Sequence, residues 1–180
     1  MKRTIRLGLV LLAVVAAACT NKEGQSESPV TVTVTLPLQP LQKSVSDGTP
    51  LQIQTITLAS HLKDPTATDP QHFADVQMNT YTVTFSRRDG GTRVPPPDQF
   101  SAAVLLPSGG TVTLNNFPIM SAATLQRSPF DQLLPFNGGV DRETGLSEIH
   151  IFYSITFFGT TVSGFRVQSQ TATGDVFIVP

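Results

Sequence analysis

The stretch Ile149-His-Ile-Phe-Tyr-Ser-Ile-Thr-Phe157 decides the fold, because each of its odd-numbered positions carries a large apolar side chain. A repeat of two residues is the period of a β-strand. We therefore predict a strand that turns its odd-numbered side chains toward a core and its even-numbered side chains toward solvent. Gly159 follows this stretch and is expected to end the strand.

The same alternation recurs in shorter segments along the chain. Val30-Thr-Val-Thr-Val-Thr-Leu36 alternates without a break, and further strands are predicted at 79–85, 100–106, 111–114, 162–168 and 176–179. Within 51–58 the apolar phase slips between Ile53 and Ile56, which predicts a bulge or a bend. The glycines at 109–110 predict a hairpin of 100–106 with 111–114, and Thr173-Gly174-Asp175 predicts a turn before the last strand.

Prolines and polar clusters mark the connections. Pro37 and Pro40 end the first strand, and the polar stretch 60–77 is the longest predicted loop, with a helical turn at 71–75. Residues 95–97, all proline, are expected to run as an exposed extended edge. The one predicted helix lies within 120–135, with Ser128 as its N-cap and Pro129 in its first position.

These elements predict an all-β protein. The expected architecture is an antiparallel, immunoglobulin-like or fibronectin-like β-sandwich of about 7–9 strands with a short helical segment. Residues 30–180 suit a single domain. The chain has no Trp, so it lacks the Cys…Trp…Cys pattern of antibody domains.

Composition excludes some partners. Charged residues make up 14% of the chain and the formal net charge is −1, so there is no basic stripe of the kind that binds nucleic acid. The single cysteine, Cys19, cannot form a disulfide within the chain. The compartment must therefore be inferred from the N-terminal sequence.

Residues 1–18 are typical of a signal peptide. Lys2, Arg3 and Arg6 form a basic start, residues 7–15 are apolar apart from one glycine, and residues 16–18 are all alanine. The apolar run is shorter than the ~20 residues that a transmembrane helix needs. We therefore expect cleavage rather than a permanent membrane span.

Ala16-Ala17-Ala18-Cys19 resembles the lipobox of bacterial lipoproteins, an aliphatic and two small residues followed by Cys. The resemblance implies cleavage before Cys19, a diacylglyceryl thioether on its sulfur, and anchoring in a membrane. Thr20, in place of Asp, resembles the pattern that sorts lipoproteins to the outer membrane of a Gram-negative host. The alternatives are a plain secretory signal with an incidental Cys, or a buried first helix.

Residues 20–29 contain no apolar side chain that could enter a core. They are typical of a flexible tether, with an end-to-end distance of about 17 Å. Residues 19–29 are thus predicted to be a lipidated cysteine and its tether.

No residue pattern points to catalysis or to a cofactor. His61 and His72 lie with Asp64, Asp69 and Asp75 in or beside the long loop, but their spacing matches neither an EF-hand nor a zinc site, so a solvated loop is favoured over a metal site. His150 lacks the motif of a nucleophile or an orienting acid around it. We predict a protein that is not an enzyme.

Phe152, Phe158 and His150 form a candidate interaction patch, because their even-numbered positions point away from the core and exposed apolar patches mark interaction sites. The alternative is that the long loop or the 122–135 segment covers the two rings. Arg87-Arg88-Asp89 is predicted to be a solvated turn tip, with contact to anionic lipid head groups as the alternative.

Together these features predict a membrane-anchored envelope lipoprotein that acts as a non-enzymatic binding or structural module, with an envelope protein as its candidate partner. The alternatives are a cell-envelope carbohydrate-binding protein or hydrolase, and a secretion-apparatus lipoprotein. A carbohydrate binder uses aromatic platforms, and a chain without Trp and with two Tyr offers few of them.

Overall fold

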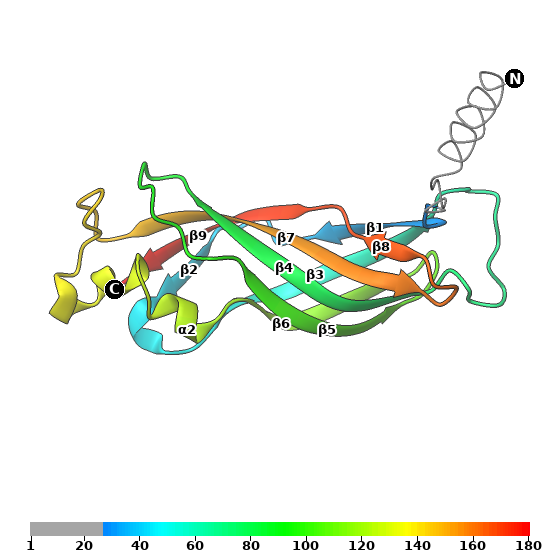
Figure 1. Cartoon of the computed structure of the whole chain (residues 1–180), viewed down its shortest axis with the longest axis horizontal. Coiled ribbons are helices and arrows are strands. Elements are labelled where there is room, and N and C mark those ends of the chain that lie inside the picture. The colour runs from blue at the N-terminus through cyan, green and yellow to red at the C-terminus, as the bar shows by residue number, and fades with distance from the viewer. Residues whose placement is uncertain (1–26) are drawn as a thin grey trace, which may run out of the picture.

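A computed structural model describes residues 27–180, which form two β-sheets packed face to face around one core (Figure 1). The smaller sheet has the order β1-β3-β6, with β1 (Val30–Thr35), β3 (Leu51–Leu62) and β6 (Thr111–Met120). The larger sheet has the order β2-β9-β7-β4-β5, with β2 (Leu41–Ser44), β9 (Ala172–Val179), β7 (Ile149–Thr161), β4 (Val76–Arg87) and β5 (Asp98–Leu106). β8 (Arg166–Gln168) also pairs with β7, beyond the end of β9. The predicted all-β sandwich is confirmed.

β7 is the central strand, and its side chains alternate as the sequence predicts. Its inward side chains are at most 2% exposed: Ile149, Ile151, Tyr153, Ile155 and Phe157. One edge of β7 pairs with β4 over nearly its whole length, whereas the other edge pairs first with β9 and then with β8. The strand thus supplies much of the core and holds three neighbours in place.

Two glycines that are predicted to break strands lie inside them instead. Gly159 is within β7, where a Cβ would collide with the backbone carbonyl of Gln77 on β4. Gly174 is within β9, where a Cβ would collide with the hydroxyl of Tyr153. Both predicted breaks are wrong, because a neighbouring strand or ring occupies the space that a side chain would need.

Tyr81 on β4 joins the two sheets. Its ring lies 5.0 Å from Phe100 of β5, 5.2 Å from Phe157 of β7 and 4.2 Å from Phe117 of β6, measured between ring centroids. The Tyr81 hydroxyl donates a 2.6 Å hydrogen bond to the carbonyl oxygen of Pro118 in β6. Burial raises the pKa of this hydroxyl, so it remains a hydrogen-bond donor between the sheets.

The predicted hairpin of 100–106 with 111–114 is wrong. β5 pairs with β4 and β6 pairs with β3, so the turn at 107–110 carries the chain from one sheet to the other. Asp75 fixes this turn by accepting a 2.7 Å hydrogen bond from the Ser108 N–H. Alternation identifies a strand but not the strand it pairs with. Here the two strands that are expected to pair belong to different sheets.

β2 is a strand that the sequence does not predict, because prolines lie close before it. It pairs in parallel with β9, from Leu41 opposite Val176 to Ser44 opposite Val179. The larger sheet is therefore mixed, and the prediction of a purely antiparallel sandwich is wrong on this point. A short 3-10 helix, η1 (Val45–Asp47), follows β2.

The predicted change of phase in β3 is present. Ile53 and Ile56 are both 0% exposed, and the two residues between them both face solvent. The pairing with β6 keeps the same register across this point, and Asn116 on β6 has a φ of 52° opposite it. In the proline run at 95–97, Pro95 is buried, which contradicts the prediction of a wholly exposed edge.

Short helices between β6 and β7 close one end of the sandwich (Figure 1). They are α2 (Ala122–Leu125), η2 (Phe130–Leu133) and η3 (Pro135–Asn137). Ser121 caps α2 by accepting a 3.0 Å hydrogen bond from the Thr124 N–H. The predicted cap, Ser128, is not at a helix N-cap, because η2 begins after Pro129. Phe130 and Leu133 are fully buried, so this segment covers the core.

Arg87 is buried at the same end, and the prediction of a solvated turn tip is wrong for it. Its side chain is 1% exposed and lies among three carboxylates. The distances are 2.7 Å from Nε to Oδ1 of Asp89, 2.8 Å from Nη2 to Oδ2 of Asp141 and 3.4 Å from Nη1 to Oε2 of Glu143. The guanidinium thus ties the β4–β5 connection to the segment that precedes β7.

These contacts keep the cluster charged. Burial alone would raise the pKa of Asp141, but hydrogen bonds from Arg87 and Thr144 outweigh it and lower the pKa to about 2. The pKa of Asp89 is also lowered against burial, by hydrogen bonds from Arg87 and from two backbone N–H groups. Burial opposes the charge on Arg87, yet the carboxylates raise its pKa.

We predict that Arg87→Met lowers the free energy of unfolding by about 3–5 kcal/mol, because it leaves buried carboxylates without their cation. The matched control is Arg88→Met, since the Arg88 side chain is 49% exposed and its removal should cost less than about 1 kcal/mol. Urea unfolding followed by circular dichroism measures both. Equal losses in the two variants would contradict the central position of Arg87.

Acid should weaken the fold in a defined range of pH. The pKa of Asp141 is about 2 in the folded protein, against an ordinary value of 3.8. The contribution of Asp141 to the free energy of unfolding is therefore complete above about pH 4, and it is lost as the pH falls toward about 2. Melting temperatures measured across this range should fall in the wild type and fall less steeply in Arg87→Met. Parallel curves for the two proteins would contradict the assignment.

Candidate functional site

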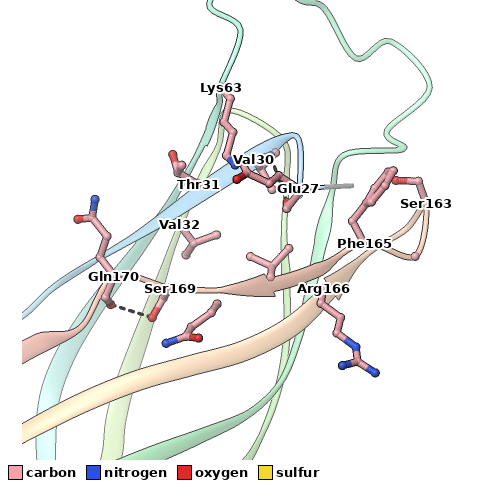
Figure 2. A pocket seen from close by; sticks show the side chains of 14 residues that line it. Glu27, Val30, Thr31, Val32, Lys63, Ser163, Phe165, Arg166, Ser169 and Gln170 are labelled. Atoms are coloured by element: carbon pink, nitrogen blue, oxygen red, sulfur yellow. Dashed lines mark hydrogen bonds and ion pairs between the residues drawn. The ribbon is translucent and has the colours of Figure 1, made fainter. Parts of the chain in front are cut away.

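β1 crosses the joint between β8 and β9, and a groove opens on each side of the crossing. At the crossing, the Gln170 N–H donates a 2.8 Å hydrogen bond to the Val32 carbonyl oxygen. The larger groove, which we call the edge groove, has a volume of about 1020 Å³ and lies between the 27–32 segment with Lys63 and the 163–170 segment (Figure 2). The smaller, the His150 groove, has a volume of about 500 Å³ and lies between the 34–40 and 172–177 segments.

The backbone of β8 directs hydrogen-bonding groups into the edge groove. Phe165 and Ser169 form backbone hydrogen bonds of 2.8 and 2.9 Å to β7. Because the backbone groups of successive residues in a strand point to opposite sides, Arg166 and Gln168 direct their N–H and C=O groups away from β7 and toward β1. The Gln168 carbonyl belongs to the parallel bridge between Val32 and Ser169, so the open part of this edge consists of the Arg166 backbone groups and the Gln168 N–H.

The backbone of β1 faces the same groove from the other side. The Pro29 carbonyl accepts a 2.9 Å hydrogen bond from the Lys63 N–H, so Val30 and Val32 direct their backbone groups away from β3. The Val32 carbonyl is bonded at the crossing, and the Val30 N–H donates to the Ser28 hydroxyl at 3.2 Å. The Val30 carbonyl oxygen faces the open groove.

The edge groove has an apolar floor and a polar rim. Val30, Val32 and Val167 are 3%, 1% and 4% exposed and separate the groove from the core. On the rim, the Lys63 Nζ lies 2.9 Å from an oxygen of Glu27, and this hydrogen bond lowers the pKa of Glu27. The lining contains no His, Cys or Asp, and its charged side chains are Glu27, Lys63 and Arg166.

The Arg166 side chain lies on the rim of β8 and turns away from β1 (Figure 2). It is exposed and makes no ion pair with another residue of the 27–180 range. Only the backbone of Arg166 therefore faces the interior of the edge groove. The effect of its N–H group on binding can thus be tested separately from the effect of its side chain.

The candidate patch of Phe152, Phe158 and His150 is spread along the outer face of β7. Phe152 and Phe158 are six positions apart in one strand, or about 20 Å, so the two rings contribute to separate surfaces. The guanidinium of Arg88 lies 4.0 Å from the centroid of the Phe152 ring and covers it in part. Phe158 is 38% exposed beside β8, opposite Gln168. An interaction role for either ring stays a prediction.

His150 belongs to the smaller groove. Its Nε2 lies 2.9 Å from an oxygen of Asp175, and its ring stacks on Phe177 with 4.3 Å between the centroids. Arg88 also lies 3.2 Å from Asp175. A general base acts on a nucleophile within hydrogen-bond reach, and Asp175 is the only side chain that hydrogen-bonds the His150 ring within residues 27–180.

The aspartates of the long loop accept hydrogen bonds from residues of the same loop. Asp64 accepts hydrogen bonds from Thr66, and Asp69 accepts two from the backbone at residues 73 and 74. His61 lies on β3, whereas His72 lies in the loop 3.3 Å from Asp75. No three His, Cys, Asp or Glu side chains converge on a point in the described part of the chain.

Cys19, the predicted lipidation residue, lies outside the described residues. Across 27–180 no helix combines the length and apolar character of a membrane span. No protein-family model matches the chain, and comparison with curated protein sequences gave no match.

The sequence does not single out the edge groove as a site. One signal does point to it: β1 reads Val-Thr-Val-Thr-Val-Thr and contains neither a charge nor a proline. Natural edge strands are normally protected by such residues. An unprotected edge is visible in the sequence, but the facing edge of β8 is visible only in the structure.

Hydrogen exchange tests the open edge. The amides of Val167 and Ser169 face β7 and should exchange slowly, whereas those of Arg166 and Gln168 face the groove and should exchange rapidly. Exchange followed residue by residue with NMR gives this alternation directly. Equally slow exchange at all four amides would show that the groove is closed in solution.

Proposed function

We propose that this protein is a membrane-anchored envelope lipoprotein, lipidated on Cys19, whose β-sandwich acts as a non-enzymatic binding module. The sequence of residues 1–19 supports the anchor, with a basic start, a short apolar run and a lipobox-like Ala-Ala-Ala-Cys. In a Gram-negative host, Thr20 directs the protein to the outer membrane.

The observation that carries the binding role is the edge groove. An apolar floor with convergent polar groups at its margins is the usual composition of a binding site. The edge groove has such a floor, formed by three valines, and it has free backbone groups on both margins. Lys63 and Glu27 form an ion pair on its rim.

The order of the strands supports an immunoglobulin-like class for the sandwich. With β1, β3 and β6 taken as strands A, B and E, and with β4, β5, β7 and β9 taken as C, C′, F and G, the sheets read A-B-E and G-F-C-C′. Variable-type immunoglobulin domains place A, B and E in one sheet and G, F, C and C′ in the other, and they add strand D beside E and strand C″ beside C′. In this scheme β2 is an extra strand that pairs in parallel with G.

The position of the groove fits a tethered module. The groove lies at the end of the molecule where β1 begins, together with β8 and the long loop, and opposite the end that carries the short helices (Figure 1). Residues 20–29 would hold this end about 17 Å from the lipidated Cys19. The groove would then face partners that lie near the membrane surface.

Replacing Cys19 tests the anchor. In a bacterial host, Cys19→Ala should move the protein from the membrane to the soluble fraction, or leave it at the mass of the unprocessed chain, because the acyl acceptor is lost. Two or more acyl chains anchor a protein stably, so the wild type should stay with membranes after a salt wash.

Thr20→Ala is the matched control, since it leaves the acyl acceptor in place and should leave membrane retention unchanged. Cell fractionation and intact-protein mass spectrometry provide the two readouts. Cys19→Ala that remains in the membrane at the wild-type mass would refute the lipoprotein proposal.

A further inference from the structure

We propose that the edge groove binds an extended segment of a partner polypeptide, which adds as a β-strand between β1 and β8. This inference rests on the proposed binding role and names its partner class. Strand addition to a free sheet edge is a general mode of peptide recognition, in which main-chain hydrogen bonds supply affinity and alternate side chains supply specificity.

The first support is that two open strand edges face one groove. The Arg166 N–H and C=O and the Gln168 N–H face it from β8, and the Val30 carbonyl faces it from β1, as the hydrogen bonds of their neighbours require. A strand placed between them has partners on both of its edges. It would lie beyond the bridge between Val32 and Ser169, where β1 and β8 separate.

The second support is that β1 lacks the features that keep other chains away from an edge. β1 has no charge, no proline and no register shift against β3. At the other edge of the same sheet, β6 contains Pro118 and a residue of positive φ, Asn116. Because bulges and prolines discourage edge pairing, the chain protects β6 and leaves β1 available.

The floor of the groove defines the side chains that fit. Val30, Val32 and Val167 present an apolar surface of small side chains. An added strand turns alternate residues toward this floor and the others toward solvent. The partner segment should therefore alternate small apolar residues with polar ones.

A partner segment is favoured over a second copy of this chain. β1 of another copy is held on one side by its own β3, and on the other by its own Gln170 at the crossing. It cannot enter the groove without giving up both contacts. A segment that is unpaired before binding has no such contacts to lose. Its only cost is the conformational entropy that it loses when it becomes ordered.

The test is a selection with random dodecapeptides displayed on phage, panned on the full-length wild-type protein in detergent and counter-selected on Arg166→Pro. Proline is tolerated in edge strands where the N–H faces outward, so this variant removes the donor that faces the groove. Arg166→Ala is the matched control, because it removes the same side chain and keeps the N–H.

The best enriched peptide, made synthetically, should bind the wild type and Arg166→Ala within about twofold of each other and bind Arg166→Pro at least about tenfold more weakly, as expected for a lost backbone hydrogen bond. Binding should slow the exchange of the Arg166 and Gln168 amides. N-methylation of alternate amides of the peptide should also weaken binding about tenfold, and this measurement stands even if Arg166→Pro does not fold.

The proposal is overturned if no peptide is enriched, if the selected peptides bind Arg166→Pro as well as the wild type and are insensitive to N-methylation, or if the two amides stay unprotected. Concentration-dependent dimerisation that the peptide abolishes would identify a second copy as the occupant and would also overturn it. These outcomes leave the membrane retention of the Cys19 variants unaffected, so failure of the strand partner and failure of the lipoprotein proposal are distinguishable.

Discussion

β7 forms hydrogen bonds on both of its edges, and the unequal lengths of its neighbours decide where the rest of the chain can lie. One edge is matched by β4, a strand of nearly equal length. The other edge is shared by β9 and the three-residue β8. The joint between these two strands is where β1 crosses, and the two grooves follow from that crossing. The candidate site is thus a consequence of how one long strand is paired.

Different interactions stabilise the two ends of the molecule. At the end with the short helices, Arg87 binds three carboxylates within a buried cluster. At the other end the sheets meet at one crossing, where Gln170 bonds to Val32, and then separate. The buried ion cluster fixes the relative positions of the segments at one end. At the other end, unpaired backbone groups leave room for an additional chain.

Local patterns in the sequence predict the strands well and their partners poorly. Alternation identifies β7 and its inward residues, because burial on one face is a local property of the strand. It cannot place β5 and β6 in different sheets, since pairing depends on residues far along the chain. Arg87 is misread for the same reason: it binds Asp141, which lies 54 positions away. Gly159 and Gly174 resemble turn residues in sequence, but contact with a neighbouring strand or ring requires them. For the site, the unprotected edge of β1 is readable in advance, whereas the open edge of β8 is not.

The pairing of β1 also has a mechanical meaning. β1 begins directly after the proposed tether and pairs with β3 in six register positions, from Val30 opposite Leu62 to Thr35 opposite Thr57. If the protein is tethered as proposed, a pull on the N-terminal end of β1 along the strand would load the hydrogen bonds between β1 and β3 at the same time, in shear. A pull across the strand would open them one after another, beginning at Val30. The resistance of the domain to a force applied through the proposed anchor would therefore depend on the angle between that force and β1.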